Sequence, residues 1–86
     1  MSDDVVNGLR DEITAIDREL VALVNRRIET VARLKRHKDE HGIAFLDPNR
    51  EAQMIADRLR ENDGPLSEDG LRAFYGELLA LIKREL

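Results

Sequence analysis

The amino-acid sequence predicts an all-α protein made of one long and two shorter helices. Apolar residues recur at spacings of three and four over residues 3 to about 40, a stretch without proline. Aliphatic side chains dominate the apolar set, and only 3% of the residues are aromatic. Gly42 is expected to begin a short loop at 42–46, and the turn-forming sequence NDGP occupies 62–65. We therefore expect three helices in a single domain that spans residues 1–86.

The first predicted helix covers residues 3 to about 40 and carries a heptad pattern. It would be about 54 Å long, whereas a compact chain of this size has a radius of gyration of only about 12 Å. Two shorter helices cannot cover such a stripe, so we expect an intertwined helical homodimer with the long helices of two copies in contact. The apolar positions are Val6, Leu9, Ile13, Ile16, Leu20, Leu23, Val31 and Leu34.

The second predicted helix runs from Pro48 to about Glu61. Gly42 ends the helix before it, and Asp47 is a suitable N-cap for a helix that has proline at its first position. Arg50 then places a cation near the positive end of the helix dipole, where an acidic residue would be more favourable. This unfavourable position suggests that Arg50 serves a binding site.

The third predicted helix begins after Ser67, which is a suitable N-cap. Lys83 and Arg84 lie near its carboxyl end, where they interact favourably with the helix dipole. Its apolar positions are Leu71, Phe74, Tyr75, Leu78, Leu79 and Ile82.

Composition argues against several classes of protein. The net charge is −4 and aromatic residues are few, so neither a basic surface nor a stacking platform for nucleic acid is expected. No apolar run approaches the ~20 residues of a membrane span, and the first residues do not resemble a signal peptide. There are no cysteines. We expect a cytoplasmic protein without a nucleic-acid or membrane partner.

Cations interrupt the apolar face of the first predicted helix. Arg27 continues the row of Val6, Ile13 and Leu20, Lys38 lies on the same face, and Arg10 lies at its margin. A buried cation costs several kcal/mol unless an anion meets it. For Arg27 the structural alternatives are an ion pair with a glutamate such as Glu12 or Glu19 and a side chain that snorkels to the rim, and for Lys38 the alternative is solvation near a helix end.

Together with Arg50, these cations predict a pocket for a small ligand with more than one carboxylate. Glu51 would accept a hydrogen bond from a ligand hydroxyl, and Asp47 would do the same or cap its helix. The sequence has no cysteine nucleophile and no glycine-rich phosphate loop. An enzyme of this composition would hold a dianion in a reactive shape and stabilise developing charge. His37 and His41 have a spacing that can bind zinc, but we interpret them as solvated and expect neither metal nor cofactor.

The sequence resembles the all-α chorismate mutases, the AroQ class. The resemblance implies a cofactor-free [3,3] rearrangement of chorismate to prephenate, on the route to phenylalanine and tyrosine. It is carried by "LRDEITAIDRELVALVNRR" (9–27), "VARLKRHK" (31–38), "DPNRE" (47–51) and "FYGELLALIKREL" (74–86), in the order and at the separations typical of the family.

The resemblance also implies roles for individual residues. Arg10 would reach into the site of the partner protomer and bind one carboxylate, and Arg27 would bind the other carboxylate in its own chain. Lys38 would donate to the ether oxygen of the breaking bond.

In the second helix, Asp47 and Glu51 would orient the ring hydroxyl, and Arg50 would support a carboxylate. The expected catalytic residues are therefore Lys38, Arg27 and Glu51.

The third helix departs from the family pattern, in which glutamine or sometimes glutamate shares the ether oxygen with the lysine. The apolar rhythm puts Leu86 at the glutamine position and Ile82 at a position that is usually small and polar. A register shifted by one residue brings Glu85 there but moves Glu77 onto an apolar row. The consequence would be a weak enzyme, an enzyme completed by an activating partner enzyme, or an adjustment of Glu85 at the helix end.

Three alternatives remain at this point. An isochorismate pyruvate lyase has the same fold but usually lacks the acid that Asp47 supplies. A 4-amino-4-deoxychorismate mutase would use the pocket acids for the ammonium group of its substrate. A non-catalytic helical dimerisation module would explain the heptads but leaves Arg27 unexplained.

Overall fold

Three helices account for most of the chain. The computed structural model describes residues 2–86, with side chains from Asp3 onward. The helices are α1 (Ser2–Glu40), α2 (Pro48–Glu61) and α3 (Glu68–Glu85), and residues 2–86 include no β-strand. The predicted all-α class and the order of one long and two shorter helices are confirmed. None of these helices combines the length and the apolar character needed to cross a lipid bilayer.

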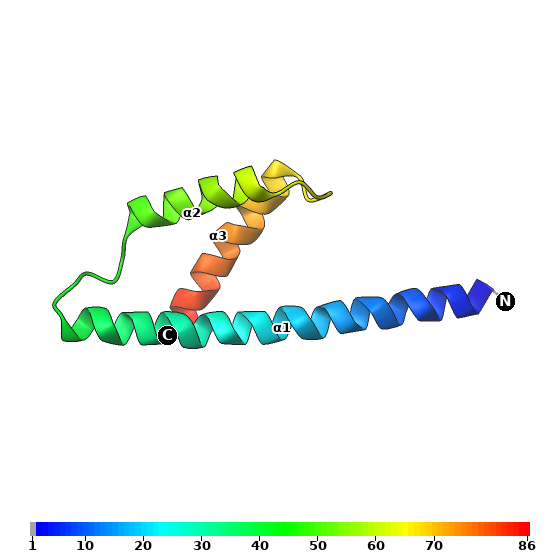
Figure 1. Ribbon diagram of the computed structural model, residues 1–86, viewed down its shortest axis with the longest axis horizontal. Coiled ribbons are helices and arrows are strands. Elements are labelled where there is room, and N and C mark those ends of the chain that lie inside the picture. Colours follow the sequence, from blue (N-terminus) through cyan, green and yellow to red (C-terminus); the bar gives the residue numbers. More distant parts are fainter. Residues whose placement is uncertain (1) are drawn as a thin grey trace.

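Helix α1 runs the whole length of the molecule (Figure 1). Its 39 residues correspond to about 58 Å, close to the longest extent of 62 Å. Gly42 follows the end of the helix, and its φ of 66° lies in the left-handed region that glycine adopts without strain. The Ile43 N–H donates to the Lys38 carbonyl at 2.8 Å, and the Gly42 N–H donates to the Asp39 carbonyl at 3.4 Å. These bonds form a Schellman motif, which satisfies carbonyl groups at the helix end.

Side-chain caps begin the other two helices. The Asp47 Oδ1 accepts from the Arg50 N–H at 3.0 Å, and Pro48 occupies the first turn. The Ser67 Oγ accepts from the Gly70 N–H at 3.0 Å. Both N-caps predicted from the sequence are therefore confirmed. Each one satisfies a backbone donor that the helix itself cannot, a contribution of about 1 kcal/mol.

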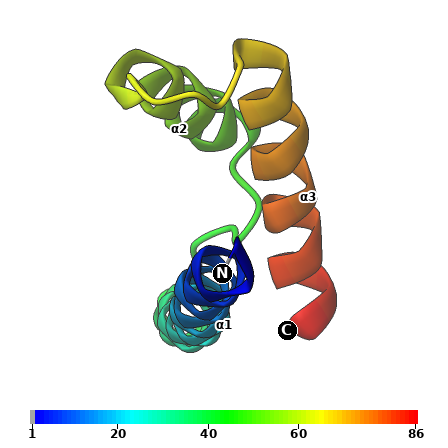
Figure 2. The ribbon, with the colours of Figure 1, turned by 90° about the vertical axis from the view of Figure 1, so that its right-hand side faces the viewer.

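The small hydrophobic core follows one face of α3, which contacts both α1 and α2 (Figure 2). Leu71, Tyr75 and Ile82 are buried, and their spacings of four and seven place them on the same side of the helix. Ile82 is only 2% exposed. Through this face α3 determines how the amino end of α2 lies relative to the carboxyl half of α1.

The amino-terminal half of α1 extends beyond α2 and α3 (Figure 1). Six of its apolar side chains remain between 42 and 57% exposed. Within the described residues of this chain, neither of the other helices covers this row. An exposed aliphatic row of this length is unusual for a monomer. The six residues are Val6, Leu9, Ile13, Ile16, Leu20 and Leu23.

Candidate active site

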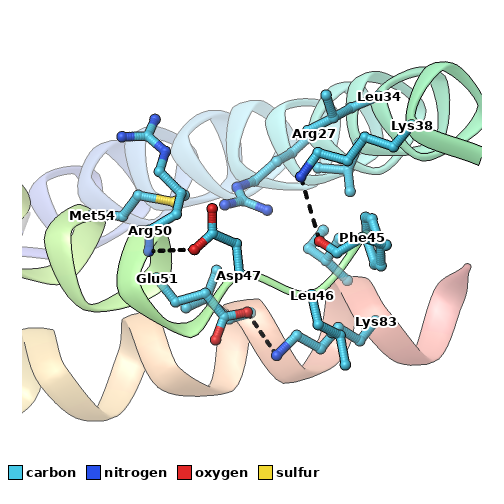
Figure 3. A pocket seen from close by; sticks show the side chains of 13 residues that line it. Arg27, Leu34, Lys38, Phe45, Leu46, Asp47, Arg50, Glu51, Met54 and Lys83 are labelled. Atoms are coloured by element: carbon cyan, nitrogen blue, oxygen red, sulfur yellow. Dashed lines mark hydrogen bonds and ion pairs between the residues drawn. The ribbon is translucent and has the colours of Figure 1, made fainter. Parts of the chain in front are cut away.

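A pocket opens where the carboxyl half of α1, the 41–47 loop, the start of α2 and the end of α3 meet (Figure 3). Its empty space amounts to about 550 Å³, part of which is open to solvent. Apolar side chains form much of the wall, and six charged residues interrupt them. The lining residues are Arg27, Val31, Leu34, Lys38, Phe45, Leu46, Asp47, Arg50, Glu51, Met54, Leu79, Ile82 and Lys83.

Two cations enter the pocket from α1. Arg27 and Lys38 are eleven residues apart, which is three turns and leaves them within about 20° of the same helix face. The Lys38 Nζ lies 3.5 Å from the Phe45 carbonyl, to which it donates. Among the described side chains, the ion pairs do not include Arg27, so the alternative in which Glu12 or Glu19 neutralises it is not observed. Arg27 remains available to an anion in the pocket.

The start of α2 contributes three charged residues. Asp47 directs one carboxylate oxygen to the Arg50 N–H, as the capping alternative predicted. Because only the backbone of Arg50 makes this bond, its guanidinium is not involved, and it extends towards α1 (Figure 3). Glu51 follows directly, and its side chain points towards α3.

Glu51 forms an ion pair that sequence reasoning missed. The Lys83 Nζ lies 2.6 Å from Glu51 Oε1, and this contact joins α3 to α2 (Figure 3). The sequence had suggested only a helix-dipole role for Lys83. The available signal was its position on α3, four residues after Leu79 and next to the buried Ile82, which puts it beside the inner face of that helix.

The charge of the lining is positive. Arg27, Lys38, Arg50 and Lys83 contribute four positive charges, and the two carboxylates reduce the sum to +2. Lys83 is matched by Glu51, whereas no carboxylate among the described residues forms an ion pair with the other three cations. Guanidinium and ammonium groups in this arrangement suit a ligand with two negative charges. The lining contains no serine, threonine or cysteine, so the arrangement favours binding and charge stabilisation over nucleophilic attack.

Three residues assigned from the family pattern do not line this pocket. Arg10 precedes Arg27 by seventeen residues, or about 26 Å along the helix, which is beyond the reach of its side chain. Glu85 and Leu86, at the end of α3, are not among the lining residues, whereas Ile82 is. In this chain α3 therefore brings Leu79, Ile82 and Lys83 to the pocket and no glutamine or glutamate.

The two histidines lie at the carboxyl end of α1. Their rings stack with centroids 4.2 Å apart, and His41 Nδ1 lies 2.8 Å from the His37 carbonyl oxygen. No group of three or more potential metal-ligating side chains occurs in the part of the chain that the structure describes.

Residues 9–85 match the sequence family described as chorismate mutase type II. The chain is 35% identical over 82 residues to a T-protein of Haemophilus influenzae, an alignment that covers 90% of this chain and 22% of that protein. It is 36% identical over 77 residues to a T-protein of Enterobacter agglomerans, covering 84% of this chain and 21% of that protein. The chain thus spans about a fifth of the length of these two curated relatives.

Two further similarities involve shorter proteins. A 4-amino-4-deoxychorismate mutase of Streptomyces venezuelae is 38% identical over 50 residues, which cover 58% of this chain and 48% of that protein. The structure of a chorismate mutase (form I) from Thermus thermophilus superimposes with a TM-score of 0.85 at 31% identity. That alignment covers 94% of this chain and 98% of the Thermus chain.

Proposed function

Since this chain belongs to the chorismate mutase type II family, we propose that it catalyses the rearrangement of chorismate to prephenate. The observation that carries the proposal is the group of three cations, Arg27, Lys38 and Arg50, around one pocket without a carboxylate partner among the described residues. Chorismate is a dicarboxylate, so it would supply the two negative charges that this lining lacks.

The proposed mechanism relies on shape and electrostatics. In the rearrangement the ether C–O bond breaks while a C–C bond forms between the two ends of the substrate, so no atom is added or lost. Arg27 and Arg50 would bind carboxylates and thereby bring these ends together. Lys38 would donate to the ether oxygen, where negative charge develops as the bond breaks. Glu51 would accept a hydrogen bond from the ring hydroxyl.

The remaining cation, Arg10, would come from a second copy of the chain. The exposed apolar row of α1 supports a homodimer, because a second α1 would bury it. The distance along α1 supports the exchange of Arg10, because this side chain cannot reach the pocket of its own chain. We propose that each site of the dimer combines Arg27, Lys38, Arg50 and Glu51 of one protomer with Arg10 of the other.

The end of α3 bears on how active the isolated chain would be. Neither Glu85 nor Leu86 lines the pocket, so α3 supplies no glutamine or glutamate that would share the ether oxygen with Lys38. This supports the proposal that the isolated chain is a weak enzyme and that an activating partner enzyme completes its site.

The direct test is turnover of chorismate by the purified chain. We expect chorismate to disappear, and prephenate to appear in equal amount, faster than in buffer alone. The control variant is Arg72→Met, which should turn over chorismate at the wild-type rate because Arg72 is an exposed cation of α3 outside the pocket. Release of pyruvate would instead identify a lyase. A rate equal to that in buffer would overturn the proposal and leave the mutase of the amino compound, the lyase that acts on isochorismate, and the dimerisation module.

A second candidate is a mutase that acts on 4-amino-4-deoxychorismate. The similarity over 50 residues to such an enzyme favours it, and the two substrates differ only at the ring position that Glu51 would contact. Comparing turnover of the two compounds under identical conditions distinguishes these functions.

A further inference from the structure

The ion pair between Glu51 and Lys83 lies in the wall of the pocket. Glu51 Oε1 and Lys83 Nζ are 2.6 Å apart, and the two side chains are 31% and 42% exposed, respectively. Both residues line the open space from different helices (Figure 3). An isolated pair this exposed contributes little to folding stability. Its position therefore suggests a role in the site rather than in the fold.

We propose that Lys83 is a specificity-determining residue, which neutralises Glu51 and thereby selects a substrate with an uncharged hydroxyl on its ring over one with an ammonium group. The inference rests on the proposed function, because it takes Glu51 as the residue that meets the ring substituent. Lys83 itself is not required to touch the substrate.

The hydrogen-bonding capacity of the pair permits a hydroxyl. A carboxylate has about four lone-pair directions on its two oxygens, and Lys83 occupies one of them on Oε1. Glu51 can therefore still accept a hydrogen bond from a neutral hydroxyl. Because a hydroxyl carries no net charge, the nearby ammonium of Lys83 repels it little and hardly weakens its binding.

The same ion pair is less favourable for an ammonium group on the ring. Its attraction to the Glu51 carboxylate is opposed by repulsion from the Lys83 ammonium, which is only a few ångströms further away. The positive sum of the lining charges adds to this repulsion. The other acid, Asp47, has one oxygen committed to the cap of α2. Neither carboxylate of the lining therefore offers an ammonium group all of its acceptor positions.

The test compares kcat/KM for chorismate and for 4-amino-4-deoxychorismate in four proteins. These are the wild type, Lys83→Met, which keeps the length of the side chain without its charge, Lys83→Arg, which keeps the charge, and the Arg72→Met control. We expect the wild type to prefer chorismate. In Lys83→Met the preference should fall by about tenfold or more, chiefly through a lower KM for the amino compound. Lys83→Arg and Arg72→Met should keep the preference of the wild type.

The outcomes of this comparison separate the proposed role from others. If Lys83 only joins α3 to α2, or if it binds a substrate carboxylate, Lys83→Met loses activity on both compounds equally and the preference stays constant. That result would overturn the inference while the proposed function stands. A wild type that prefers the amino compound would overturn it as well. Should Lys83→Met lose its helical circular-dichroism signal, Lys83→Gln replaces it. Wild-type protein that turns over neither compound would refute the proposed function itself.

Discussion

Arg27 and Lys38 lie three turns apart on α1, and both side chains line the pocket that α2 and α3 close (Figure 3). Because one rigid helix carries both groups, the backbone positions of the proposed carboxylate clamp and of the proposed donor to the ether oxygen are set before substrate binds. Such an arrangement needs little rearrangement during the reaction, which is the condition under which fixed charges contribute most to a rate.

The first prediction concerns Lys38. Lys38→Ala should lower kcat by about a hundredfold or more, because it would remove the proposed charged donor to the ether oxygen, where negative charge develops. The melting temperature should change little, since the hydrogen bond of Lys38 is to the Phe45 carbonyl near the end of α1. Arg36→Ala, an exposed cation on the same helix that does not line the pocket, is the control and should keep the rate. Wild-type turnover in Lys38→Ala would refute the assignment.

The second prediction concerns assembly. At micromolar concentration the chain should sediment as a dimer, because the exposed row of α1 would otherwise remain in water. Ile13→Asp should shift the equilibrium to monomer and abolish turnover, as it would place a charge in the centre of that row. Asp17→Asn, an exposed polar position on α1, serves as the control. A monomeric wild type with full activity would contradict both the dimer and the exchange of Arg10.

The third prediction uses mixed dimers to locate Arg10. Arg10→Ala and Lys38→Ala should each be nearly inactive alone. After the two variants are mixed and allowed to exchange subunits, half of the dimers are hybrids, and each hybrid has one intact site. About a quarter of the wild-type activity should therefore return. Mixing Arg27→Ala with Lys38→Ala is the control and should restore nothing, because each hybrid site keeps one defect. If the first mixture also restores nothing, Arg10 acts within its own chain.

Local and distant contacts differ in how well the sequence predicted them. The caps at Asp47 and Ser67 and the end of α1 at Gly42 involve groups at most five residues apart, so short motifs identify them. The common face of Arg27 and Lys38 follows from helical periodicity alone. Glu51 and Lys83, in contrast, are 32 residues apart and meet only because of the angle at which α3 crosses α2. No periodic pattern in the sequence predicts that crossing angle.

The fourth prediction concerns acid stability. Hydrogen bonds from Arg58 hold the pKa of Glu61 below its ordinary value of 4.5. A depressed carboxyl pKa stabilises the folded state above the unfolded value, and this contribution disappears as the pH falls through the folded value. Glu61→Gln should therefore have a lower urea midpoint than the wild type at about pH 6, and the difference should shrink below pH 4.5. A difference that stays constant down to about pH 3 would contradict this linkage.

The fifth prediction is that Arg27→Leu stabilises the unliganded protein while it abolishes turnover. Arg27 is half-buried and forms no ion pair among the described side chains, so no carboxylate among them compensates its charge on the apolar face of α1. Leucine would continue the row of Val6, Ile13 and Leu20, and the melting temperature should rise. Such a gain in stability with a loss of activity is typical of a functional site.

Melting curves with and without a dicarboxylate mimic of the transition state complete this test of Arg27. A ligand that binds only the folded state raises its melting temperature. The mimic should therefore stabilise the wild type and Arg26→Leu, an exposed neighbouring position used as the control, but not Arg27→Leu. If Arg27→Leu instead melts below the wild type and still gains stability from the mimic, the arginine supports the fold and does not bind the substrate. The two interpretations of Arg27 thus predict opposite signs for the same pair of measurements.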